Sequence, residues 1–319
     1  MTARGSYITQ QVGAIIMKYV APSAPLTVGG VLDNWIRLFR SSFASCWALA
    51  LIVAAVGSLL EFMIVPRVPQ FHPGGSLPQF YAQYWAAVGG PSIVPTYIAF
   101  WLLTLTVYGA LLTQQAALVR GEEPFSFGTA LSKSVRRLPQ MLLGSILVIL
   151  IVAAFCAPVG IALFMASRHA AALDILLASL ASIAAVILLL YVSVRLQFWM
   201  AAMFSENLGG AASLGRSWRL AKGHWWRVTG IVFVAGIVMW VLTMTIGVLV
   251  GFVVGVMAFH GVTPDVAVRR MELIGALGQV AHLLTMPLLA AVWLAIYQDL
   301  RLRREGGDLA ARAEALSGR

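Results

Sequence analysis

Ionisable side chains inside apolar runs are the residues of this sequence with the clearest capacity for chemistry. Glu61, Arg195 and His282 each lie within a long apolar segment. A charge inside a membrane is expensive, so such residues commonly mark ion or proton pathways. A carboxylate and an imidazole at similar depth, as expected for Glu61 and His282, would suit a proton relay. Alternatively, Glu61 reaches the outer interface, His282 is a hydrogen-bonded packing residue, and Arg195 extends to the cytoplasmic headgroups or pairs with Glu206.

The usual catalytic motifs are absent from the sequence. It contains no GxxxxGK[ST] phosphate loop, no HExxH zinc motif and no GxSxG nucleophile elbow. The five histidines are scattered singly, and the two cysteines lie apart in apolar runs, so no metal-ligand spacing is present. We therefore expect a protein that is not an enzyme and that carries no metal or other cofactor.

The composition points to a membrane. Of the 319 residues, 60% are apolar and 11% are charged, which is too little charge to cover a soluble surface. A membrane helix needs about 20 apolar residues, and the runs that reach this length are 43–66, 93–119, 140–166, 174–204, 228–259 and 274–299. The predicted fold is an all-α polytopic membrane protein. It has a cytoplasmic segment at 1–26, a six-span membrane domain at 27–305 and a cytoplasmic tail at 306–319.

The net charge of +10 is concentrated on one side of this arrangement. Seventeen of the 22 lysines and arginines fall before the first span, in the second and fourth connections, or in the tail. Four fall in the other connections, and Arg195 lies inside a span. Because positive loops remain in the cytoplasm, both termini are expected there. A nucleic-acid partner is not expected, because the chain has no basic soluble domain.

Three segments that precede a span share one pattern. Residues 28–43, 127–142 and 209–226 begin with small residues and continue with apolar and basic residues at helical spacing. Such a segment is expected to form an amphipathic helix in the cytoplasmic interface, with its basic side chains among anionic headgroups. The fold is thus predicted as three repeats of one interfacial amphipathic helix and two spans. The candidate contacts to lipid headgroups or partners are Arg37, Arg40, Arg136, Arg137, Arg216, Arg219, Lys222 and Arg227.

Two further patterns concern packing and anchoring. Gly247, Gly251 and Gly255 are spaced four apart and would let another helix approach closely, from this chain, a second copy or another membrane protein. In the external connection 67–92, aromatic residues are expected to anchor a short helix at the headgroups, and a substrate-binding aromatic box is the alternative. Those aromatic residues are Phe80, Tyr81, Tyr84 and Trp85.

Residues 195–231 and 295–309 carry a family resemblance. The first stretch begins with Arg195 and continues through an apolar run, the acid Glu206, small residues, the sequence RSWRL and a Gly-x-aromatic-aromatic-Arg sequence. Together the stretches resemble the glycerophosphoryl diester phosphodiesterase membrane-domain family and related six-span bacterial proteins. Gln298 and Gly307 stand where an aromatic residue is more usual. The terminal residues that match the family pattern are Tyr297, Asp299, Arg301, Arg304, Glu305, Gly306 and Asp308.

This resemblance implies a membrane domain of the bacterial inner membrane. The catalytic histidine-arginine-glycine motif of the soluble phosphodiesterase domain is absent from this chain, so phosphodiesterase activity is not implied. Charges around the end of the last span predict a cytoplasmic ion-pair network of Glu206, Asp299, Arg301 and Arg304. In this network Asp299 would bond to Arg216 or Arg219, and local i,i+4 pairs are the alternative.

These features together predict a non-catalytic membrane protein that acts as a lipid-associated scaffold or accessory subunit. Its expected partners are anionic phospholipids, with other membrane proteins or a second copy as further candidates. The alternative function is a transporter or permease subunit with a polar site near Glu61 and His282.

Overall fold

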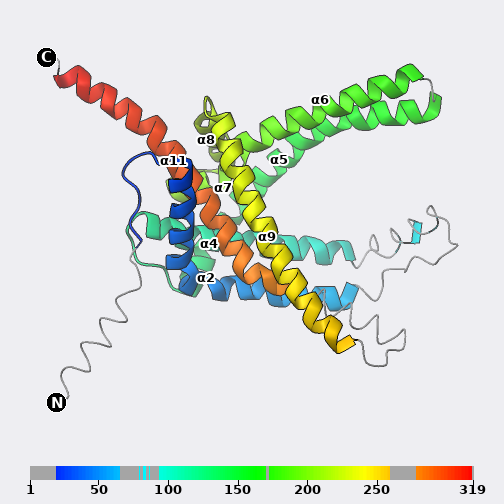
Figure 1. The fold of residues 1–319 in the computed structure, drawn as a ribbon, viewed down its shortest axis with the longest axis horizontal. Helices are drawn as coiled ribbons and strands as arrows, with labels where there is room; N and C mark the ends of the chain where they lie inside the picture. Colours follow the sequence, from blue (N-terminus) through cyan, green and yellow to red (C-terminus); the bar gives the residue numbers. More distant parts are fainter. Residues whose placement is uncertain are drawn as a thin grey trace. The chain divides into compact units, whose positions relative to one another are not determined.

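The computed structural model describes residues 19–64, 79, 82–83, 86, 93–169, 172–258 and 278–317. No strand occurs in these residues, so the predicted all-α class is confirmed. The helices (Figure 1) are α2 (Val28–Ile64), α4 (Ile93–Val119), α5 (Phe127–His169), α6 (Ala172–Leu196), α7 (Trp199–Glu206), α8 (Gly210–Ala221), α9 (Trp225–Ala258) and α11 (His282–Ser317), with a 3-10 turn, η2, at Gln279–Ala281.

Six stretches of helix in the described residues are long and apolar enough to cross a membrane. They are Val28–Leu60, Val94–Val119, Phe127–Ala162, Leu173–Glu206, Trp225–Phe252 and Leu283–Gly306. This finding confirms the prediction of a six-span polytopic protein. The threefold repeat stays a prediction.

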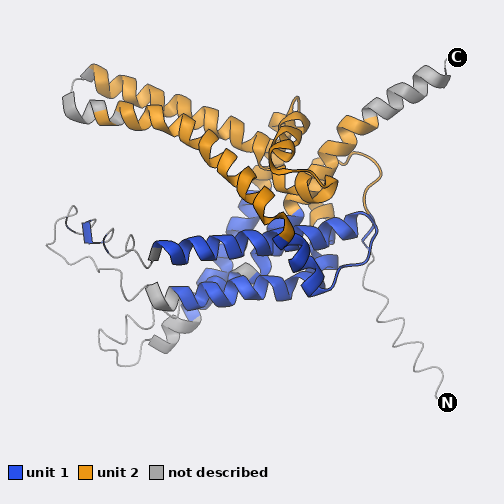
Figure 2. Cartoon of the chain, turned by 180° about the vertical axis from the view of Figure 1, so that it is seen from behind, with its two compact units in different colours: residues 1–20, 36–135, 235–291 blue, residues 21–35, 136–234, 292–319 orange. Residues whose placement is uncertain are grey.

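The chain divides into two compact units (Figure 2). Unit 1 consists of residues 1–20, 36–135 and 235–291, and unit 2 of residues 21–35, 136–234 and 292–319. Helices α2, α5, α9 and α11 each contribute residues to both units.

In unit 1, a buried glutamine joins three spans. The Gln115 amide on α4 donates from Nε2 to Ser42 Oγ on α2, at 3.2 Å, and to the carbonyl oxygen of Pro287 on α11, at 2.8 Å. Ser134, at the start of α5, donates to the carbonyl oxygen of Thr106 on α4, at 2.6 Å. In an apolar surrounding such bonds hold spans together, because the helices gain little from hydrophobic burial against one another.

In unit 2, α5 and α6 run antiparallel and lie side by side in both views (Figures 1 and 2). Their shared core includes Val192 and Leu196 of α6 and Leu214 of α8. Side chains of α5 and α7 pack against this core, namely Leu147, Val148, Ile151, Phe155 and Trp199. The short helix α8 is therefore packed onto the other helices of its unit through an apolar contact.

The three segments predicted as interfacial helices differ in structure. The segments at 28–43 and 127–142 form the first turns of α2 and α5 and continue without a break into the spans. The third forms the separate helix α8, because the chain turns sharply on both sides of it. Asn207 (φ 59°) ends α7, and Gly223 (φ 87°) follows α8, both in the left-handed region.

Candidate functional site

The cytoplasmic end predicted for α11 carries charges on two of its faces. Tyr297, Arg301 and Glu305 are spaced four apart, so they lie on one face of the helix. Asp299 and Arg303 are also four apart, and they lie about 200° around the helix axis from Tyr297 and Arg301. The structure places a separate cluster of polar contacts on each face, and both clusters lie within unit 2.

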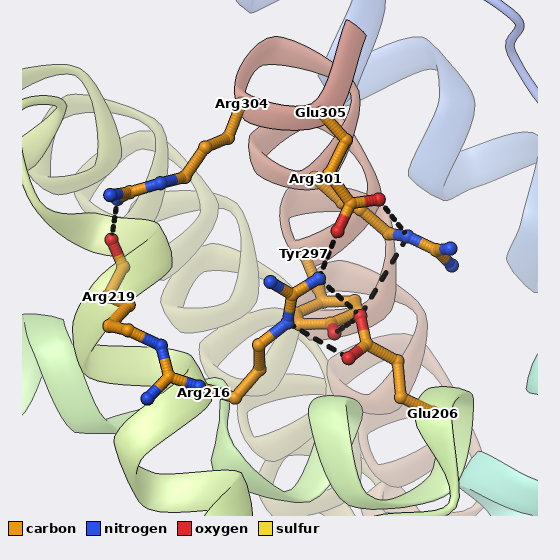
Figure 3. Close-up of polar contacts among 7 residues, drawn as sticks. All are labelled: Glu206, Arg216, Arg219, Tyr297, Arg301, Arg304 and Glu305. Atoms are coloured by element: carbon orange, nitrogen blue, oxygen red, sulfur yellow. Dashed lines mark hydrogen bonds and ion pairs between the residues drawn. The ribbon is translucent and has the colours of Figure 1, made fainter. Parts of the chain in front are cut away.

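The Glu206 cluster consists of Glu206, Arg216, Tyr297, Arg301 and Glu305 (Figure 3). Arg216 of α8 donates two hydrogen bonds to Glu206, the last residue of α7, from Nε to Oε2 at 2.9 Å and from Nη2 to Oε1 at 2.8 Å. Arg216 also bonds to Glu305, and the Tyr297 hydroxyl donates to Glu206 Oε1. Arg301 Nε lies 2.7 Å from Glu305 Oε2 and 3.8 Å from Glu206 Oε1.

The charges of the Glu206 cluster balance, since two carboxylates face two guanidinium groups. Hydrogen bonding to Glu206 is the main reason that the pKa of Arg216 is raised above its ordinary value. The Arg216 and Glu206 side chains are only 19% and 18% exposed. A pair that is this well covered and bidentate is a stronger tie than a solvated ion pair. The cluster therefore fastens α7 and α8 to α11.

The Asp299 cluster ties the segment before α2 to the same helix. The backbone N–H of Leu26 donates to Asp299 Oδ1 at 2.8 Å. Arg303 Nε and Arg227 Nη2 donate to Oδ2 at 3.0 and 3.2 Å, and both arginines also donate to the carbonyl oxygen of Leu26. Asp299 is 1% exposed. Two arginines around one carboxylate leave this cluster with a positive charge.

One of the partners predicted for each of two residues was wrong. Asp299 was expected to bond to Arg216 or Arg219, with local i,i+4 pairs as the alternative. The alternative is confirmed by its pair with Arg303, and its other contacts go to Leu26 and Arg227, because it points away from the face that carries Tyr297. Glu206 was offered as a partner for Arg195, but it binds Arg216, Tyr297 and Arg301.

Three side chains of the two clusters were missing from the predicted site residues. Tyr297 and Glu305 were expected only as matches to the resembling family, and Arg303 was covered only by the general expectation of i,i+4 pairs. Arg303 follows Asp299 by four residues on a helix, and this spacing could have predicted the contact between Arg303 and Asp299.

The basic residues predicted to face headgroups fall into three groups. Arg216 and Arg227 belong to the two clusters, and Arg137 donates to the carbonyl oxygen of Met203 at 2.7 Å. Arg304, which was expected in the ion-pair network, donates instead to the carbonyl oxygen of Arg219. The side chains that lie exposed are Arg37 and Arg40 in unit 1, and Arg136, Arg219 and Lys222 in unit 2.

Several predicted features lie outside the described residues. The backbones of Glu61 and His282 belong to α2 and α11, but their side chains are outside the description, as are the aromatic residues predicted at 80, 81, 84 and 85. A Cβ added at Gly247 or Gly251 would meet no described atom within 4 Å, so no described helix of this chain packs against them, and packing by a second copy or another membrane protein stays a prediction. Gly255 belongs to α9, and no neighbour of it is described.

The described part of the chain offers no constellation for metal chemistry. No group of three or more His, Cys, Asp or Glu residues in it is arranged to hold a metal ion. The carboxylates of the two clusters are instead committed to arginines, the Tyr297 hydroxyl and a backbone N–H. Their arrangement supports a structural role for these acids.

The six apolar helices define a multi-pass membrane protein. The chain belongs to the family described as "Domain of unknown function (DUF7847)", whose model matches residues 71–300. The matched range includes Glu206, Arg216, Tyr297 and Asp299. No curated protein and no solved structure matches the chain. The resemblance to the phosphodiesterase membrane-domain family stays a prediction.

Proposed function

We propose that this chain is a non-catalytic protein of the bacterial inner membrane that binds anionic phospholipids at its cytoplasmic face and serves as a scaffold or accessory subunit. One observation carries the proposal. On α8, the charge of Arg216 is neutralised by Glu206 and Glu305. Arg219 in the last turn of α8 and Lys222, the next residue after the helix, are exposed. Glu206 and Glu305 are thus paired with arginines, and the exposed charge that remains at Arg219 and Lys222 is positive.

The helix that carries Arg219 and ends just before Lys222 is held firmly. One side of α8 is buried, and its buried residues include Ser213, Leu214, Ser217 and Leu220. At its first turn the Gly210 N–H donates to Gln140 Oε1 of α5 at 3.0 Å, which satisfies one of the free donors of a helix start. A rigid helix can offer charges to a headgroup without the entropy loss of ordering a loop.

The positive charge of the exposed surface at Arg219 and Lys222 suits the anionic cytoplasmic leaflet of the membrane. Anionic lipids attract basic residues at the membrane surface by about 1 kcal/mol for each lysine or arginine. In the described part of unit 2, Arg136 and Arg304 are exposed as well, and Arg301 is exposed but paired with Glu305. The orientation that this proposal needs, with α8 and the end of α11 in the cytoplasm, follows from the uneven distribution of lysine and arginine.

Native mass spectrometry of the full-length protein in detergent tests this proposal. The protein would be titrated with phosphatidylglycerol and with phosphatidylcholine of identical acyl chains. The wild type is expected to retain phosphatidylglycerol preferentially, and R219Q/K222Q is expected to lose about tenfold in that preference. R219K/K222R keeps both charges and should behave as the wild type. An unchanged preference in R219Q/K222Q would overturn the proposal.

A further inference from the structure

Arg195, near the end of α6, is a buried cation with no acid beside it. The residue is 9% exposed, and its Nε atom is fully buried without a hydrogen-bond partner. Within the described residues its side chain has no hydrogen bond and no ion pair. An arginine keeps its charge in proteins and carries five N–H donors. A buried charge that lacks both a counter-ion and acceptors is costly, so this side chain calls for an anion.

Two aromatic rings hold the guanidinium in place. Its Cζ atom lies 4.4 Å from the ring centroid of Trp218 on α8 and 4.7 Å from that of Tyr191 on α6. The two rings meet edge to face, with centroids 6.3 Å apart, and Trp225 lies 5.9 Å from Tyr191. Cation–π contacts stabilise the charge from the ring faces. They leave the N–H groups free to donate elsewhere.

The backbone around Arg195 is also fixed. Ser217 Oγ donates to the carbonyl oxygen of Arg195 at 2.6 Å and accepts from the Phe198 N–H at 3.2 Å. The Ser217 hydroxyl of α8 thus bonds to the backbone just before and just after the end of α6, at Arg195 and at Phe198. This holds Arg195 and Trp218 in register, so the arrangement of the guanidinium and the two rings exists before any ligand arrives.

We propose that Arg195, Trp218 and Tyr191 form a binding site for a phosphate group, and that a membrane phospholipid supplies it. A guanidinium offers parallel N–H donors that match the oxygens of a phosphate. The rings of Trp218 and Tyr191 are partly exposed, and amphipathic rings of this kind lie where lipid headgroups meet acyl chains.

This inference rests on the proposed function for the choice of a lipid as the ligand, but it requires a different chemical group of that lipid. The exposed Arg219 and Lys222 select lipids by net charge. The Arg195 site recognises phosphate, which phosphatidylcholine carries as well as phosphatidylglycerol. The two proposals can therefore fail separately.

The test uses native mass spectrometry of the full-length protein with three probes that share their acyl chains: phosphatidylcholine, phosphatidylglycerol and diacylglycerol, which lacks phosphate. The wild type is expected to hold one phospholipid of either kind and not diacylglycerol. R195Q is expected to weaken phosphatidylcholine retention about tenfold, because charge-assisted hydrogen bonds are lost. If R195Q does not fold, R195M fills the space between the rings without a charge and gives the same readout.

The outcomes separate the two proposals and the two phosphate sources. Unchanged phosphatidylcholine retention in R195Q or R195M overturns the site, whatever R219Q/K222Q shows. Loss of retention in R195Q, together with no effect of R219Q/K222Q, supports the site and removes the proposed function. Competition by millimolar glycerol phosphate supports the site with a soluble phosphate ester as its ligand, and lack of competition supports the lipid.

Discussion

Glu206 and Arg216 are ten residues apart in the sequence and face each other through two hydrogen bonds of 2.9 and 2.8 Å. The turn at Asn207, whose φ is 59°, ends α7 and allows α8 to begin at Gly210. The same carboxylate accepts the Tyr297 hydroxyl from α11, as Figure 3 shows. This pair therefore closes the corner between α7 and α8 and attaches it to the last helix.

The double-mutant cycle of E206Q and R216Q measures the strength of this pair. Each single variant is expected to lower the thermal stability of the detergent-purified protein, because each removes the bidentate ionic contact of a mostly covered charge and leaves that charge only its weaker contacts to Glu305 or to Tyr297 and Arg301. The expected coupling free energy is about 1–3 kcal/mol. The control is the pair of Arg120 and Glu122 after α4, whose Nε and Oε1 atoms lie 2.8 Å apart and whose side chains are 39% and 48% exposed. E122Q should change stability by less than about 1 kcal/mol. Equal effects of E206Q and E122Q would contradict this account.

Asp299→Asn should release the segment before α2. The variant removes the charge that Arg227 and Arg303 share, and breaking a buried pair costs about 3–5 kcal/mol. Limited proteolysis would then cut near Leu26 faster than in the wild type, together with a lower melting temperature. R301Q, which alters the opposite face of α11, serves as the comparison and should leave cleavage near Leu26 slow. Equal cleavage rates in D299N and wild type would count against the anchoring role.

Gly210→Ala should destabilise the contact between α8 and α5. A Cβ at this position would overlap the carbonyl oxygen of Gln140 and lie 3.0 Å from the nitrogen of Gly144, both backbone atoms. Overpacking of this kind costs about 1–3 kcal/mol. Gly215→Ala lies on the same helix and meets only the end of the Arg219 side chain at 3.6 Å, so its better helix propensity should stabilise by up to about 1 kcal/mol. Thermal unfolding of the two variants should show opposite signs.

The six spans could be predicted because apolar length alone decides whether a helix can cross a membrane. The ionic partners of the charged residues could not be predicted in the same way, because they depend on which face of α11 meets α7 and α8. Asp299 illustrates this point. Its own i,i+4 neighbour Arg303 was accessible from spacing, whereas Leu26 and Arg227 come from distant parts of the chain.

The environment of Arg195 was equally hard to foresee. The sequence favoured headgroup contact or a pair with Glu206 for this residue. Its contacts with Trp218 and Tyr191 arise only because α8 folds back against α6, with Ser217 bonded to the Arg195 carbonyl oxygen. That reversal depends on Asn207 and Gly209, whose local conformations a hydrophobic pattern does not specify.

Gln115→Leu tests the polar tie among the spans of unit 1. Leucine is of similar size but leaves Ser42 and the Pro287 carbonyl oxygen without the amide donor. Hydrogen bonds between membrane helices contribute about 0.6–1.7 kcal/mol, so a modest fall in melting temperature is expected. Thr113→Val is the control on the same helix, because the hydroxyl bond that the structure describes for Thr113 stays within α4, to the Gly109 carbonyl oxygen. A larger effect of Thr113→Val than of Gln115→Leu would contradict the role assigned to Gln115.

Photocrosslinking in native-like membranes tests the central claim, anionic-lipid binding at α8, most directly. The full-length protein would be reconstituted with photoactivatable phosphatidylglycerol or phosphatidylcholine, and the labelled peptides would be mapped. We expect phosphatidylglycerol to label the peptide that holds Arg219 and Lys222 more than phosphatidylcholine does, and R219Q/K222Q to remove that difference. Equal labelling of this peptide by both lipids in the wild type would contradict the claim.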